Sequence, residues 1–128
     1  MIRLPLAAFL LVVGVLWGSG FVAAGPQFDE RNSALLQGLD KITARVSALP
    51  IAVGETISFF GLRITLRACR QSAPIESPEA AAYLEIVEIS PGEQAEQVFS
   101  GWMFASSPAL SGLEHPIYDV WVIACGSK

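Results

Sequence analysis

The residues that could catalyse a reaction lie near the C-terminus, around the single histidine of the chain, His115. It follows Glu114 directly and lies four residues before Asp119. Three serines precede it: Ser106, Ser107 and Ser111. A serine, a histidine and a carboxylate can form a hydrolase triad if the imidazole reaches both partners. The simpler interpretation is that His115, directly before Pro116, is a loop residue bonded to a nearby backbone group or carboxylate.

Other catalytic patterns are absent from the sequence. It contains no Gly-x-Ser-x-Gly, no P-loop and no dinucleotide-binding glycine motif. One histidine excludes a zinc site built from several histidines, and Cys69 and Cys125 have neither CxxC spacing nor a neighbouring histidine. We therefore expect a protein that is not an enzyme and that holds no metal and no cofactor.

The segment 99–121, FSGWMFASSPALSGLEHPIYDVW, is rich in aromatic and apolar side chains and has no basic residue. A small domain needs some of these side chains for its core. Alternation along a strand sends Trp102 and Phe104 to one face and Phe99 or Met103 elsewhere, so part of the aromatic surface could stay exposed for a partner. The candidate partner-binding residues are Phe99, Trp102, Met103, Phe104, Leu110, His115, Tyr118 and Trp121. The sequence leaves open whether this segment is core or interface.

The N-terminus carries an uncharged apolar segment, 4–28, after a single basic residue, Arg3. The segment is typical of an export signal cleaved after Ala24, which would leave 104 residues. The alternative is an uncleaved signal anchor, because residues 4–21 are just long enough to cross a bilayer. In both cases the residues after about position 25 are expected in the periplasm. In that oxidising compartment we expect Cys69 and Cys125 to form a disulfide.

The chain has twelve acidic and eight basic residues, a net charge of −4. This balance argues against a nucleic-acid partner. The basic residues are segregated before residue 71, as Arg31, Lys41, Arg45, Arg63, Arg67 and Arg70, and none follows until Lys128. Either arginine-bearing strands pair with glutamate-bearing strands across one sheet face, or the acidic half forms a patch that orients a partner.

The clearest element is a strand over 62–70, in which apolar residues alternate with Arg63, Thr65 and Arg67. Cys69 falls in the arginine register, so we expect a bulge or a disulfide on the surface side. Further strands are predicted at 41–47, 55–60, 83–89, 98–105 and 117–125, the last of them central because it is apolar on both faces. The apolar spacing from Leu35 to Ile42 predicts a short helix or turn, and Ser107-Pro108 predicts helical turns over 108–113.

About six strands with Gly and Pro turns predict an all-β fold. We expect a small antiparallel sandwich or partly open barrel with one short helical turn, preceded by an N-terminal hydrophobic signal or anchor helix. The predicted organisation is a signal peptide or signal anchor at 1–24, a linker at 25–37 and a disulfide-stapled β domain at 38–128.

The sequence resembles an alphaproteobacterial family of small exported proteins that is defined only as a domain of unknown function. The motif GWMFASSPAL (101–110) and the following HPIYDVW (115–121) carry the resemblance, which extends to LDKITARV (39–46), FGLRITLRAC (60–69) and AAYLEI (81–86). The resemblance implies an envelope location and the cysteine pair, but no reaction. It also implies a gene neighbourhood beside an accessory subunit of respiratory complex I, the NADH:ubiquinone oxidoreductase.

We therefore expect a non-catalytic periplasmic accessory protein that binds or stabilises an inner-membrane protein complex, with respiratory complex I as the candidate partner. If residues 4–21 are not cleaved, they would hold it in the inner membrane. The alternative is a free periplasmic ligand-binding or inhibitor domain with an aromatic cleft for a glycan or peptide.

Overall fold

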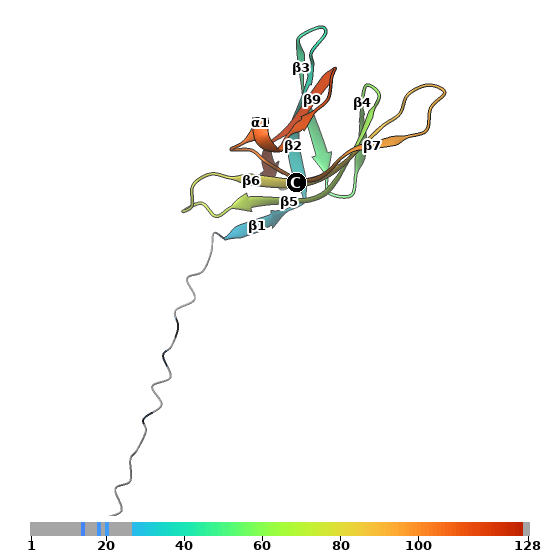
Figure 1. Cartoon of the computed structure of the whole chain (residues 1–128). Helices are drawn as coiled ribbons and strands as arrows, with labels where there is room; N and C mark the ends of the chain where they lie inside the picture. The colour runs from blue at the N-terminus through green and yellow to red at the C-terminus, as the bar shows by residue number, and fades with distance from the viewer. Residues whose placement is uncertain (1–13, 15–17, 19, 21–26, 127–128) are drawn as a thin grey trace, which may run out of the picture.

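A computed structural model describes residues 14, 18, 20 and 27–126 and contains two antiparallel β-sheets (Figure 1). Sheet A has the strand order β1-β5-β6-β7, and β4 also pairs with β5. Its strands are β1 (Phe28–Arg31), β4 (Thr56–Phe59), β5 (Leu62–Ser72), β6 (Ala80–Glu88) and β7 (Glu96–Phe104). Sheet B has the order β3-β2-β9-β8, formed by β2 (Ser33–Asp40), β3 (Arg45–Ala52), β8 (Leu113–Glu114) and β9 (Tyr118–Gly126). One short helix, α1 (Pro108–Ser111), joins the sheets.

The predicted all-β, antiparallel architecture with one short helical turn is confirmed. Residues 27–126 form nine strands where the sequence predicted about six, because the N-terminal part of the domain adds β1 and β2 and a short β8 precedes β9. The signal peptide or anchor at 1–24 lies outside the described residues, three isolated glycines excepted. Within the described part of the chain, no helix has the length and apolar character needed to span a membrane.

The core lies between the two sheets. Sheet A contributes Leu62, Ile64, Leu66, Leu84, Ile86 and Met103, and sheet B contributes Leu36, Ile51, Val120 and Val122. All ten side chains are at most 2% exposed. Strand β9 pairs with β2 along its length and with β8 only at Asp119 and Val120, so its predicted central position is confirmed for that part of the strand.

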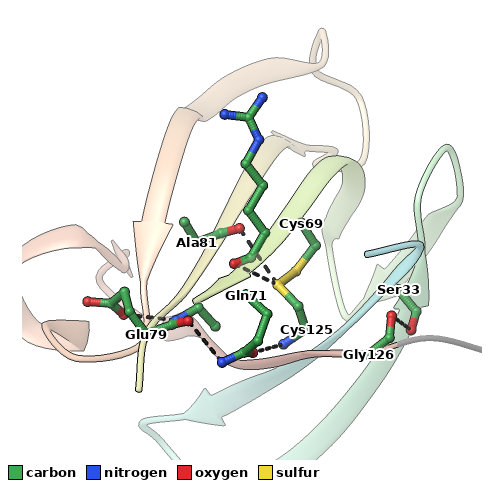
Figure 2. Close-up of a disulfide and its surroundings, with 9 residues drawn as sticks. Ser33, Cys69, Gln71, Glu79, Ala81, Cys125 and Gly126 are labelled. Atoms are coloured by element: carbon green, nitrogen blue, oxygen red, sulfur yellow. Dashed lines mark hydrogen bonds between the residues drawn. A yellow bond between two sulfur atoms is a disulfide. The ribbon is translucent and has the colours of Figure 1, made fainter. Parts of the chain in front are cut away.

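The disulfide between Cys69 and Cys125 joins β5 of sheet A to β9 of sheet B, as Figure 2 shows. The register of β5 with β6 shifts between Leu66 and Ala68, so Arg67 is the extra residue of a β-bulge. The shift turns Cys69 from the arginine register to the core side, where it is 1% exposed. The bulge expected from the sequence is therefore confirmed, and the alternative of a surface-side disulfide is wrong for Cys69.

One hydrogen bond next to the disulfide, from Cys125 to Gln71, also connects the two sheets, and two further bonds act within a single sheet (Figure 2). The backbone N–H of Cys125 donates to Oε1 of Gln71 at 3.3 Å, and Nε2 of Gln71 donates to the carbonyl of Glu79 at 2.9 Å. Ser33 Oγ donates to the Gly126 carbonyl at 2.8 Å. The end of the sandwich where β1 begins and β9 ends is thus held by one covalent bond and several hydrogen bonds.

The predictions for residues 25–47 are corrected by the structure. The segment given as a linker contains β1 and most of β2, and the helix or turn expected from Leu35 to Ile42 is largely strand β2. Residues 41–44, placed in a strand by the sequence, form the turn of the β2–β3 hairpin. Asp40 directs this turn, because its Oδ1 accepts the N–H groups of Ile42 and Thr43 at 2.9 and 3.3 Å.

Candidate functional site

The outer side of sheet A carries a shallow depression of about 190 Å³, lined by Phe28, Arg70, Ala81, Trp102 and Phe104. We call these five residues the outer aromatic face. Arg70, Ala81 and Phe104 lie opposite one another on β5, β6 and β7. Strand β1 adds Phe28 at the edge of the sheet by pairing with the end of β5. Four strands thus bring together residues from both ends of the domain sequence.

Contacts around Trp102 hold this face in one arrangement. The Arg70 guanidinium lies 5.1 Å from the centre of the Trp102 ring, a cation–π distance. Tyr83 meets the same indole edge-on, with ring centres 5.4 Å apart. Phe28 and Phe104 are still 39% and 38% exposed. The face therefore presents aromatic surface and one cation to its surroundings without having to rearrange.

The eight predicted partner-binding residues do not form one surface. Trp102 and Phe104 point outward together, as alternation predicted. Met103 is fully buried, and Phe99 packs against the core. Both are thus corrected to core positions, because they share the inward register of β7 with Gly101.

The other four candidates lie elsewhere in the fold. Leu110 projects from α1 and is 90% exposed, and Trp121 lies on the outer side of sheet B. His115 lies in the connection from β8 to β9, and its ring stacks on that of Tyr118, the first residue of β9. Phe28 and Arg70 were not among the predicted residues. Unbroken alternation along β5 would send Arg70 to the same face as Leu66, and only the bulge at Arg67 turns it outward.

His115 is held by bonds that do not involve a serine. Its Nε2 lies 3.0 Å from a carboxylate oxygen of Glu88, and its Nδ1 accepts the N–H of Ile117 at 3.1 Å. Because Nδ1 accepts, the neutral ring carries its proton on Nε2 and donates to Glu88. Ser111 Oγ instead bonds to carbonyls at Phe104 and Ser107, and Ser106 Oγ bonds to Glu79. The interpretation of His115 as a loop residue bonded to a carboxylate is confirmed. The carboxylate is that of Glu88 on β6, which is near His115 in space but distant in sequence.

A stack of rings that the sequence did not predict lies next to His115. Phe60 stacks face to face on Tyr118, with centres 5.3 Å apart and planes 7° from parallel. Phe59 meets both rings edge-on. Phe60 has a φ of 52°, in the left-handed region, and is 61% exposed in the two-residue turn between β4 and β5. The stack joins the two sheets at the end opposite the disulfide.

Some of the charged groups form pairs at the surface. Arg67 of β5 binds Glu85 of β6 at 3.0 Å, and this pair confirms the interpretation in which arginine-bearing and glutamate-bearing strands pair. Lys41 lies 2.9 Å from Asp119. Among residues 27–126, no group of three or more His, Cys, Asp or Glu side chains is arranged to hold a metal ion.

Glu79 is the best-bonded carboxylate of the described chain. Its Oε1 accepts the N–H groups of Ala80 and Ser106 at 3.0 Å each, and Oε2 accepts the Ser106 hydroxyl. Partial burial raises the pKa of Glu79, but the hydrogen bonds, that of the Ser106 side chain first, outweigh burial and hold the pKa below its usual value. The bonded carboxylate fastens the loop before β6 to the segment after β7, a structural role.

A second depression, of about 390 Å³, lies on the outer side of sheet B beside α1. Its lining consists of Pro108, Ala109, Gly112, Leu113, Glu114, Asp119, Val120 and Trp121. We call it the α1 groove. It differs from the outer aromatic face in carrying carboxylates in place of an arginine.

Comparisons with known proteins place this chain among bacterial proteins of undetermined role. A family model described as "Uncharacterized protein conserved in bacteria (DUF2155)" matches residues 34–125. The chain is 29% identical over 99 residues to the uncharacterized protein RP359 of Rickettsia prowazekii (strain Madrid E). This match covers 77% of the chain and 64% of the relative, so the chain spans a little under two thirds of that protein. No solved structure matches.

Proposed function

The chain belongs to the DUF2155 family of bacterial proteins, and we propose that it is a non-catalytic periplasmic accessory protein that binds or stabilises an inner-membrane protein complex. The observation that carries this proposal is the outer aromatic face. Its largest side chain, Trp102, is fixed by Arg70 and Tyr83, and Phe28 and Phe104 stay open to solvent on either side. Tryptophan, tyrosine and arginine are the residues that contribute most to binding in protein interfaces.

The surroundings of the outer aromatic face also suit a protein interface. A binding surface usually has an apolar centre and a polar rim. Here Glu30 lies 3.8 Å from Arg70, and Ser100 lies within 3.3 Å of the Tyr83 hydroxyl. The Arg67–Glu85 pair lies further along the same sheet. A partner would therefore bury the rings in the centre and keep its charged groups at the edge.

The periplasmic location and the candidate partner rest on the sequence. The apolar segment 4–21 is suited to export or anchoring, and a disulfide is typical of an oxidising compartment. Respiratory complex I is the candidate because of the gene neighbourhood that the family resemblance implies.

A pull-down of the native protein from membranes in mild detergent tests the proposal. Mass spectrometry of the eluate would identify the partners and the N-terminus of the protein itself. We expect subunits of one inner-membrane complex in near-equal amounts, and complex I subunits if the candidate is correct. Recovery as a processed, partner-free protein would overturn the proposal and support the free ligand-binding or inhibitor domain.

Trp102→Ala should weaken this association without unfolding the domain. Loss of an interface tryptophan typically costs about 2 kcal/mol or more, so we expect at least a tenfold fall in co-purified partner. Ile42→Ala is the matched control, because Ile42 is 76% exposed in the β2–β3 turn, away from the outer aromatic face. Thermal unfolding would be followed for both variants. Unchanged co-purification with Trp102→Ala, or a fall equal to that of Ile42→Ala, would contradict the assignment of this face.

A further inference from the structure

The α1 groove has an aromatic side and an acidic side. Leu113 and Val120, which are opposite each other on β8 and β9, point into the core and are at most 6% exposed. The neighbouring pair Glu114 and Asp119 is also directly opposite and therefore points outward. Trp121, two residues after Asp119 on β9, has the same orientation. The two carboxylates and the indole thus share the outer surface of sheet B.

Of the two carboxylates in the groove, Asp119 is paired with a cation and Glu114, among the described residues, is not. Asp119 Oδ1 is held by Lys41 Nζ at 2.9 Å, and that nitrogen also donates to the His115 carbonyl at 2.8 Å. Glu114 is exposed, and within residues 27–126 it has no ion pair and no side-chain hydrogen bond. No lysine or arginine follows in the sequence between Arg70 and Lys128. The groove therefore keeps one uncompensated negative charge.

Going beyond the proposed function and not depending on it, we propose that the α1 groove binds an arginine side chain from an extended segment of a partner protein. A guanidinium can bond to the Glu114 carboxylate through two N–H groups and stack its plane on the Trp121 indole. Its apolar stem would lie against Pro108 and Ala109, which are exposed at the groove wall.

The volume of the groove also suits a single side chain. A volume of about 390 Å³ is at the lower end of the range for small-molecule sites and is ample for one arginine. Lysine would supply a point charge without the planar fork, so it would lose either the second hydrogen bond or the stacking. The groove is thus expected to prefer arginine over lysine, and both over a neutral side chain.

NMR on the full-length, ¹⁵N-labelled protein in detergent micelles tests this proposal. The probe is the peptide acetyl-Gly-Arg-Gly-amide, and the signal is the indole N–H of Trp121, identified with Trp121→Phe. We expect the chemical shift of this signal to change and to reach saturation as the arginine peptide is added. The corresponding lysine peptide should bind several-fold more weakly and the neutral citrulline peptide at least tenfold more weakly.

Glu114→Gln should reduce the affinity for the arginine peptide at least tenfold, because it removes the charge and keeps the shape. Glu93→Gln removes an equal charge from the exposed β6–β7 loop and should leave the affinity within twofold. An absent shift, equal binding of the arginine and citrulline peptides, or equal losses in the two variants would overturn the proposal. Trp102→Ala should leave peptide binding unchanged, which separates this site from the outer aromatic face.

Discussion

Glu79 links the stability of the domain to pH, because hydrogen bonds from Ala80 and Ser106 favour its ionised form. A carboxyl whose pKa is lowered by folding stabilises the folded state above its ordinary value of 4.5. That contribution is lost as the pH falls from 4.5 through the lower folded value. Glu79→Gln should therefore destabilise the protein at pH 7 and have little effect well below pH 4.

The expected loss is about 1 kcal/mol at pH 7, below the roughly 1.5–3 kcal/mol of hydrogen bonds to a charged group because Glu79 is partly exposed to water. Urea unfolding of the full chain at pH 7 and pH 3 measures it. Glu76→Gln, in the same loop but exposed, is the control and should change neither value. A loss of equal size at both pH values would mean that Glu79 acts through its shape and not its charge.

Gly38 of β2 and Phe59 of β4 set how closely the two sheets approach. A Cβ atom on Gly38 would lie 2.7 Å from Cζ of the Phe59 ring, closer than two carbons can pack. Phe59 is 5% exposed and also meets Tyr118. We expect Gly38→Ala to lower the free energy of unfolding by about 1–3 kcal/mol, the usual cost of overpacking.

Phe59→Leu tests the origin of that loss. The smaller side chain leaves room for the added methyl group, so the Gly38→Ala, Phe59→Leu double variant should lose less stability than the sum of the single variants. Chemical denaturation of the three variants gives this coupling. Strict additivity would show that the loss from Gly38→Ala does not come from the contact with Phe59.

Strand β5 could be predicted from the sequence because its partners lie on both sides and its outward face is polar, which makes the alternation visible. Strand β2 could not, because Leu35 and Leu39 lie on one face while Leu36 and Gly38 face the core. Apolar residues on both faces produce a spacing that also satisfies a helix. Only the pairing with β3 and β9, set by residues distant in sequence, separates the two interpretations.

The outer aromatic face and the α1 groove likewise depend on strand pairing between residues that are distant in the sequence. Alternation along the strand was enough to place Trp102 and Met103 on opposite faces of sheet A. Phe28 reached the outer aromatic face only because β1 pairs with the end of β5, and Glu114 reached Trp121 through the two-residue pairing of β8 with β9. Short strands at sheet edges carry little pattern in their own sequence, so neither surface could be assembled before the topology was known.

The disulfide is expected to carry a large share of the stability of the domain, since Cys69 and Cys125 are 56 residues apart and belong to different sheets. Closing a loop of that length restricts the unfolded chain by about 4 kcal/mol in the chain-entropy description. The hydrogen bond from Cys125 to Gln71 and the shared apolar core remain when the disulfide is broken, so the sheets should stay together but unfold at a lower denaturant concentration. A Cys69→Ala, Cys125→Ala double variant should lose about 3–4 kcal/mol of unfolding free energy. Dithiothreitol should lower the stability of the natural protein to a similar value and leave the double variant unchanged. A loss below about 1 kcal/mol would show that packing between the sheets is sufficient without the covalent bond.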